Sequence, residues 1–222
     1  GCTRNSKYQL PKDGGLINDN APKDIIHRYE RMPTRVFENE YNGVQYVADI
    51  ICRLVRQHGE NASARDIYEE LPPFVLGLTT GNTPMGLYRE LVRRHREGEI
   101  SFSNVAVYTL DEFYPIRRTE QQSRNFRIHD EFLKHIDIQP ENVHIPDGTV
   151  SEANISEYCA NYDKSIRKID LMIIGFGEDG QVGFNEQGSY AKSHTRLVEL
   201  SHNSRKVQSN QFFGLENTPK MA

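Results

Sequence analysis

Residues 171–186 read Leu171-Met172-Ile173-Ile174-Gly175-Phe176-Gly177-Glu178-Asp179-Gly180-Gln181-Val182-Gly183-Phe184-Asn185-Glu186. The uncharged apolar run at its start, which breaks into glycines and acids, predicts a buried strand over residues 171–175 that ends in a tight acidic turn. Open α/β sheets bind ligands at the carboxyl ends of parallel strands. Glycines let the backbone approach a ligand, and the carboxylates of Asp179 and Glu186 can hold or transfer protons. The stretch is therefore a candidate site; the alternative is an ordinary polar turn, in which the same residue types are common.

Two further apolar runs, residues 74–78 and 105–110, predict buried strands that precede this one. Apolar residues at helical spacing lie before and between the strands, at Val36, Val44, Val47, Ile51 and Leu54 and within residues 85–95, 126–136 and 155–162. Strands that alternate with helices tend to pair in parallel and to carry helices on both faces. The sequence therefore predicts an α/β fold of three layers with a mostly parallel sheet.

Residues 1–30 are rich in Asn, Lys, Asp, Gly and Pro and have little periodic apolar content. This composition predicts a flexible N-terminal arm. We expect packed structure from about Pro33, so that residues 31–222 form one α/β domain. A chain of 222 residues is long enough for one large domain or at most two small ones.

The chain has 27 Lys and Arg against 31 Asp and Glu, a formal net charge of -4. This balance provides no basic field, so no nucleic-acid partner is predicted. The basic cluster at residues 93–96 is predicted on the solvated face of a helix. No apolar run approaches the roughly 18 residues that a membrane span requires, so the sequence predicts a soluble protein without a membrane partner.

The three cysteines, Cys2, Cys52 and Cys159, are widely spaced and form no Cys-x-x-Cys pair. Neither a disulfide framework nor a structural zinc site is indicated. Cys52 falls on an apolar helical stripe and is predicted to be a small buried side chain. A reducing cytoplasm is the predicted location. The alternative for Cys2 is the lipid-bearing end of a processed lipoprotein.

Thr79-Thr80-Gly81-Asn82-Thr83 follows the first predicted strand, and Pro84 comes directly before the next helical stretch. Proline suits a first helical turn. A short loop that leads into a helix N-terminus presents free N–H groups and the positive end of the helix dipole to an anion such as phosphate. The alternative is a structural loop, because threonine and proline also begin ordinary helices.

The second predicted strand is followed by Asp111-Glu112. Adjacent residues of an extended chain point to opposite sides, so we expect only one of the two acids to face a cleft. A carboxylate close to a phosphate-binding loop can abstract a proton from a carbon next to a carbonyl. The alternative is a pair of surface acids.

These three motifs, in this order, resemble the glucosamine-6-phosphate deaminase/isomerase family and, more loosely, its 6-phosphogluconolactonase relatives. Residues 77–88 resemble the family's phosphate loop and first helix, residues 110–113 its acidic motif, and Phe184-Asn185-Glu186 its signature. Residues 101–105 and His194-Thr195-Arg196 are also similar. The resemblance runs from about Met32 to the end of the chain. It implies a Rossmann-like sheet and an aldose–ketose mechanism that needs no metal or other cofactor.

The resemblance also implies roles for individual residues. The acid at Asp111 moves a proton at C2 of the opened sugar, the acid at Asp179 assists, and the residue at position 181, oriented by Glu186, opens the ring. The implied catalytic residues are Asp111, Asp179, Gln181 and Glu186. The implied substrate contacts are Thr79, Thr80, Gly81, Asn82, Thr83, Glu112, Gly177 and Arg205. A sugar phosphate is the predicted small-molecule partner, and a homo-oligomer is the predicted assembly.

The sequence departs from the family pattern in three places. The ring-opening histidine is replaced by Gln181, whose amide donates and accepts hydrogen bonds but transfers no proton near neutral pH. Where the family has an arginine at the phosphate, this chain has Ser209-Asn210-Gln211. The chain stops at Ala222, where the family continues through further elements that include a lysine at the phosphate. We therefore expect the C-terminal part of the family fold to be missing.

Three functions follow from this pattern. The first is an aminosugar-phosphate deaminase/isomerase, and the second is a diverged isomerase or a lactone hydrolase that acts on a related sugar phosphate. The third is a non-catalytic sugar-phosphate-binding or regulatory module that keeps the fold without the proton shuttle. His194 or His202 could replace the missing histidine, and Arg205 could replace the missing arginine, although each of the three is also a common type of surface residue.

Overall fold

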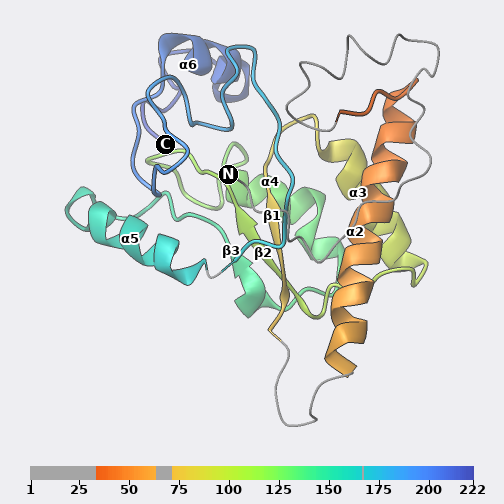
Figure 1. The fold of residues 1–222 in the computed structure, drawn as a ribbon. Helices are drawn as coiled ribbons and strands as arrows, with labels where there is room; N and C mark the ends of the chain where they lie inside the picture. Colours follow the sequence, from red (N-terminus) through yellow and green to blue (C-terminus); the bar gives the residue numbers. More distant parts are fainter. Residues whose placement is uncertain (1–33, 64–71, 167) are drawn as a thin grey trace.

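The computed structural model describes residues 34–63, 72–166 and 168–222, and Figure 1 traces them as a ribbon. The centre is a four-stranded sheet with the order β3-β2-β1-β4, in which every pair of neighbours is parallel. The strands are β1 (Phe74–Leu78), β2 (Val105–Thr109), β3 (Val143–His144) and β4 (Leu171–Met172). The predicted parallel α/β sheet is confirmed.

The two central strands agree with the sequence-based prediction, whereas the outer strands agree less well. β1 and β2 pair along their whole length and are almost entirely buried, as central parallel strands are. β4 pairs with β1 at Leu171 and Met172 alone, so the strand is shorter than the predicted residues 171–175. β3 is not predicted by the sequence, because two half-buried residues form no apolar run.

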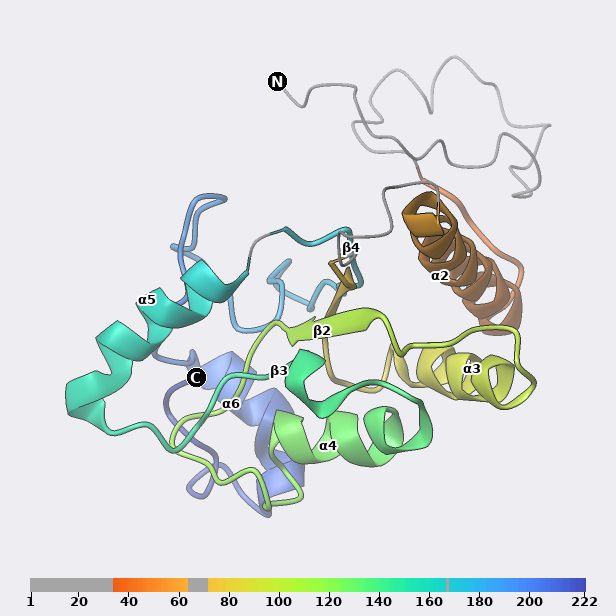
Figure 2. The same cartoon turned by 90° about the horizontal axis from the view of Figure 1, so that it is seen from below.

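Helices cover both faces of the sheet. The helices α2 (Glu40–Ser63), α3 (Met85–Arg96) and α4 (Arg124–Glu131) share one apolar core with β1 and β2. The helix α5 (Ile155–Ser165) covers the opposite face, where the Tyr108 hydroxyl donates a hydrogen bond to the Ser165 carbonyl oxygen over 2.9 Å. Figure 2 shows α5 on the other side of the sheet from α3 and α4. The prediction of three layers is confirmed.

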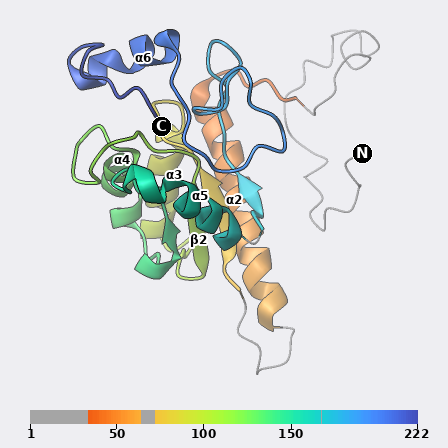
Figure 3. The ribbon, with the colours of Figure 1, turned by 90° about the vertical axis from the view of Figure 1, so that its left-hand side faces the viewer.

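The last helix, α6 (His202–Gln208), lies at the end of the molecule toward which the strands point (Figures 1 and 3). Single-turn 3₁₀ helices occupy Leu133–His135, Pro140–Asn142, Glu152–Asn154 and Ser209–Phe212. A second apolar cluster, made of Phe113, Ile116, Phe184, Leu200 and Phe212, joins the segment after β2 to the acidic turn and to the C-terminal segment. This cluster holds the three segments together at the carboxyl end of the sheet.

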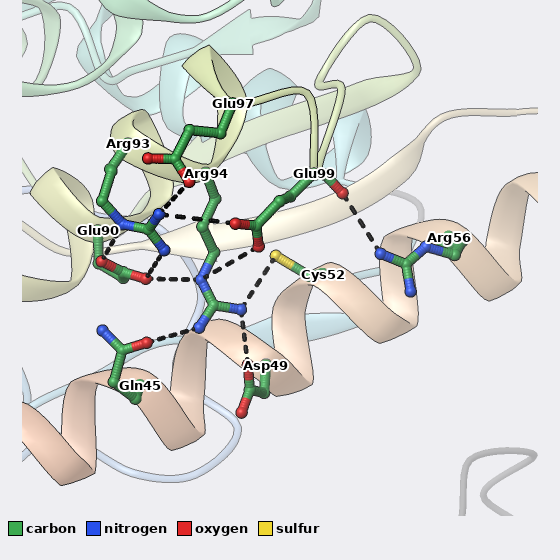
Figure 4. A network of polar contacts seen from close by, with 9 residues as sticks. All are labelled: Gln45, Asp49, Cys52, Arg56, Glu90, Arg93, Arg94, Glu97 and Glu99. Carbon is green, nitrogen blue, oxygen red and sulfur yellow. Dashed lines mark hydrogen bonds and ion pairs between the residues drawn. The ribbon is translucent and has the colours of Figure 1, made fainter.

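The basic cluster at residues 93–96 is not wholly on a solvated face, and for Arg94 the prediction is wrong. Arg94 is only 6% exposed, and its guanidinium donates to Glu90 on α3 and to Asp49 and Gln45 on α2, over 2.6–2.8 Å (Figure 4). A buried charge with this many partners is compensated. The cation therefore fastens α2 to α3, and the sequence spacing alone could not reveal those partners.

Two other predictions concern the N-terminal part of the chain. Cys52 is buried, as predicted, but Val36 is 75% exposed and precedes α2, so Val36 does not belong to the apolar stripe of this helix. The predicted arm of residues 1–30, with Cys2, lies outside the described residues. Among the helices that the structure describes, none combines the length and the apolar character needed to cross a membrane.

Candidate functional site

A cavity of about 510 Å³ opens at the carboxyl ends of β1, β2 and β4 and is bordered by α6. Because these strands are neighbours and parallel, the loops that follow them meet at one edge of the sheet. Of the residues that the sequence singles out, seven line the cavity: Thr79, Thr80, Gly81, Thr83, Asp111, Gly177 and Gln181. Asn82 belongs to the same loop but is not part of the lining.

The loop after β1 leaves hydrogen-bonding groups free at the start of α3. The N-cap residue of this helix is Pro84, which makes no side-chain hydrogen bond to cap it. The hydroxyl of Thr80 is buried and has no hydrogen-bond partner. Gly81 has a φ of 137°, which side chains rarely tolerate, so glycine is needed for the loop to turn here. An unpaired hydroxyl and the positive end of a helix dipole beside a cavity form a suitable site for an anion.

Asp111 is enclosed at the inner end of the cavity. Its side chain is 12% exposed, and its Oδ1 atom lies 4.0 Å from the Nε of Arg124. Burial raises the pKa of the Asp111 carboxyl, while Arg124 and the N–H of Phe184 act in the opposite direction. The acidic turn can approach Asp111 because residue 183 is glycine: a Cβ there would lie 2.5 Å from the Oδ2 of Asp111. Asp111 is thus a carboxyl that accepts a proton more readily than a solvated one.

A backbone hydrogen bond closes the acidic turn, and Gln181 lines the cavity. The N–H of Gly177 donates to the carbonyl oxygen of Gln181 over 2.8 Å, and Gly180 takes a φ of 77° to close the turn. The side-chain Oε1 of Gln181 accepts a hydrogen bond of 3.0 Å from the N–H of Asp179. The amide of Gln181 is therefore held at the cavity wall by its own turn.

The carboxylates of Asp179 and Glu186 connect the turn to α6 and do not line the cavity. Asp179 accepts a hydrogen bond of 2.6 Å from the side-chain amide of Asn203, and Glu186 accepts one of 3.1 Å from the N–H of Ser201. Both acids thus lie next to the site and position its walls.

The family comparison agrees with this geometry. Residues 48–211 match the family of glucosamine-6-phosphate isomerases and 6-phosphogluconolactonases. The chain belongs to this family.

Two relatives show how far the similarity extends. The glucosamine-6-phosphate isomerase of Candida albicans is 37% identical over 196 residues, which cover 86% of this chain and 73% of that protein. A glucosamine-6-phosphate deaminase-like protein of Bacteroides thetaiotaomicron is 36% identical over 200 residues, which cover 89% of this chain. The chain spans 29% of the length of the Bacteroides protein.

Solved structures of the family share the fold. A monomeric glucosamine-6-phosphate deaminase superimposes with a TM-score of 0.73 at 29% sequence identity, over 83% of this chain and 72% of that chain. The 6-phosphogluconolactonase of Thermotoga maritima superimposes with a TM-score of 0.55 at 19% identity, over 84% of this chain and 74% of that chain. The sequence-based assignment to the deaminase/isomerase family is confirmed.

Glu112 follows Asp111 in the sequence, but its side chain is directed into the protein and does not line the cavity. Its carboxylate accepts four hydrogen bonds of 2.7–2.9 Å, from the hydroxyl of Ser123 and from the N–H groups of Phe113, Arg124 and Asn125. Three of these donors, on Ser123, Arg124 and Asn125, are at the start of α4, so Glu112 caps this helix. Burial raises the pKa of Glu112, and the four donors oppose the shift. In the structure Glu112 has a structural role, and its contact with a substrate stays a prediction.

Replacing Glu112 with Gln is expected to lower the free energy of unfolding by about 2–4 kcal/mol, because an amide cannot accept all four hydrogen bonds and leaves buried donors unpaired. Chemical denaturation measures this loss. Glu141→Gln is the control, since Glu141 is exposed, and a change within about 0.5 kcal/mol is expected there. Equal losses in the two variants would contradict the capping role of Glu112.

Three other residues that the sequence singles out, Arg205, His194 and His202, lie outside the lining of the cavity. Arg205 donates to the carbonyl oxygens of Leu215 and Thr218, over 2.8 and 3.2 Å, and so supports the C-terminal segment. His194 is 87% exposed and pairs with Asp163 at 2.6 Å, and His202 begins α6. None of these three lines the cavity as the structure describes it.

The sequence does not reveal Arg124, which lines the cavity behind Asp111. Arg124 is the first residue of α4, and its guanidinium carbon lies 4.7 Å from the ring centre of Phe113 and 5.2 Å from that of Phe184. Nothing in the local pattern around residue 124 distinguishes it from Arg127, one turn further along. Among the described residues, no group of three or more His, Cys, Asp or Glu side chains is arranged to hold a metal ion.

Proposed function

We propose that this protein is an aminosugar-phosphate deaminase/isomerase, which converts glucosamine 6-phosphate and water into fructose 6-phosphate and ammonia. One observation carries the proposal: a buried carboxyl, Asp111, and the loop after β1, through Thr79, Thr80, Gly81 and Thr83, border the same cavity. The names of the relatives with 36–37% identity support the same reaction.

In this reaction the phosphate group is held by the loop after β1, and this anchor fixes the reacting carbons against Asp111. Asp111 then moves a proton between C2 and C1 of the opened sugar. The raised pKa of Asp111 suits this role, because such a carboxyl accepts a proton more readily than a solvated one. The free hydroxyl of Thr80 and the uncapped start of α3 provide neutral donors for the phosphate oxygens.

Gln181 and the two neighbouring acids act around the ring oxygen. The amide of Gln181 orients this oxygen by hydrogen bonding but cannot deliver a proton to it. Asp179 positions Gln181 through its N–H group, and Glu186 holds the acidic turn against α6. We therefore expect ring opening to be slow and to limit turnover.

The test is to incubate the 222-residue protein with glucosamine 6-phosphate and to measure ammonia and fructose 6-phosphate. Equal amounts of both products are expected. A folded sample that binds the sugar phosphate without releasing ammonia would contradict the proposal. That result would favour the second candidate, a sugar-phosphate-binding module, which is motivated by the amide at position 181.

A panel of related substrates separates the remaining alternatives. Turnover of another phosphorylated sugar, or hydrolysis of 6-phosphogluconolactone, would indicate a diverged enzyme of the same family. The domain formed by residues 31–222, the cytoplasmic location and the homo-oligomer stay predictions from the sequence. Size-exclusion chromatography with light scattering measures the oligomeric state.

A further inference from the structure

The cavity is lined by more acidic than basic side chains. Four charged side chains line the cavity: Glu40, Asp111, Glu178 and Arg124. Within the described part of the chain, Arg124 is the only Lys, Arg or His in the lining. A sugar phosphate is a dianion, and a cavity with three carboxylates repels it unless a cation compensates.

Arg124 has unused hydrogen-bonding capacity. It is 5% exposed, its Nε is buried without a partner, and its Nη2 reaches the side-chain oxygen of Gln208 only at 3.5 Å. The nearest carboxylate oxygen, that of Asp111, is 4.0 Å away, beyond hydrogen-bonding distance. A buried guanidinium stays charged and normally fills its donors, so these free donors indicate an absent acceptor.

The side chain is also held in place. The backbone N–H of Arg124 donates to Glu112, Ser123 caps the helix, and the rings of Phe113 and Phe184 pack against the guanidinium. A planar cation that is fixed before the ligand arrives loses little entropy on binding. Arg124 is therefore a preformed group that faces the cavity.

We propose that Arg124 is the cation that binds the phosphate group of the substrate in this cavity. The loop after β1 provides neutral donors, and the guanidinium of Arg124 provides the charge and a pair of parallel N–H groups for the phosphate oxygens. The inference rests on the proposed function for the identity of the substrate. The phosphate group itself can be tested separately.

Binding of inorganic phosphate, measured by isothermal titration calorimetry, tests the proposal in three variants. Arg124→Met is expected to weaken phosphate binding by roughly 10- to 100-fold, because a charge-assisted hydrogen-bonded pair is lost. Arg124→Lys should recover part of the affinity, since it keeps the charge without the planar fork. Arg127→Met is the matched control: Arg127 lies on the same helix, pairs with Glu131 at 3.3 Å and does not line the cavity.

Equal phosphate affinity in Arg124→Met and the unaltered protein, or an equal loss in Arg127→Met, would overturn the proposal. So would a lack of phosphate binding by the unaltered protein. A second measurement covers the case in which Arg124→Met does not fold. The Nε–Hε resonance of Arg124, assigned by its loss in Arg124→Lys, should shift on titration with phosphate, and an unchanged resonance would reject the assignment.

The test of Arg124 and the test of the deaminase activity can give different results. Phosphate binding that depends on Arg124 without ammonia release supports the inference and contradicts the deaminase activity. Ammonia release with a KM that does not change in Arg124→Lys supports the activity and contradicts the inference. If the protein is a deaminase and Arg124 binds the phosphate group, the KM for glucosamine 6-phosphate should rise in Arg124→Lys. The inhibition constant for unphosphorylated glucosamine should not change.

Discussion

Replacing Asp111 with Asn is expected to lower kcat for ammonia release by roughly 10²–10⁴-fold, the usual contribution of a positioned general acid or base. The amide has nearly the same size and lies in the same enclosed position, 4.0 Å from Arg124 in the unaltered protein. It cannot accept a proton near neutral pH, so the transfer between C2 and C1 loses its carrier. Steady-state assays of ammonia and fructose 6-phosphate measure the effect.

Asp130→Asn is the matched control for this prediction. Asp130 is an exposed acid on α4 that pairs with Lys134, and its change to an amide should leave kcat unaltered. Phosphate binding by Asp111→Asn should be retained or improved, because a negative charge near the anion has been removed. If kcat of Asp111→Asn equalled that of the control, Asp111 would not be the proton carrier.

Replacing Gln181 with His is expected to raise a slow deaminase activity by roughly 10²–10⁴-fold, because an imidazole can transfer the proton that opens the ring. The geometry permits the exchange. The side chain of Gln181 lies at the cavity wall, where it accepts the N–H of Asp179 at 3.0 Å, and an imidazole at this position can direct a ring nitrogen to the cavity. Ammonia release at several pH values measures the gain.

Gln181→Asn is the control, since it keeps an amide at the position without a titratable group, and no gain is expected there. The rate of Gln181→His should fall as the pH drops below about 6.5, where a base in the ring-opening step would become protonated. An unchanged rate in Gln181→His would mean that residues other than Gln181 limit the reaction. The binding module would then be the better description of the protein.

The predictable part of the candidate site is the part that follows the strands. The loop at residues 79–83 and Asp111 each follow a buried strand, Gln181 belongs to the turn that follows β4, and parallel strands bring such positions to one edge. The sequence also predicts the burial of Cys52 correctly. Local pattern was sufficient here because the side-chain period and the order of the elements determine where these residues go.

Other residues have roles that depend on partners far along the chain. Glu112 and Asp111 are adjacent and chemically alike, yet one caps α4 and the other faces the cavity. Arg94 resembles its solvated neighbours, but α2 provides Asp49 and Gln45 as its partners. Spacing within one element contains no information about which atoms a second element will place opposite it.

The sequence by itself determined the parallel α/β sheet, the positions of the loops at its carboxyl end and the membership of the family, because these depend on local periodicity and on motifs. Only the tertiary structure decided which charged side chains are directed into the cavity. The rings of Phe113 and Phe184 pack against the guanidinium of Arg124, which lines the cavity. Arg205 instead donates hydrogen bonds to carbonyl oxygens of the C-terminal segment and does not line the cavity. The burial that gives these side chains their partners exists only after the chain has folded.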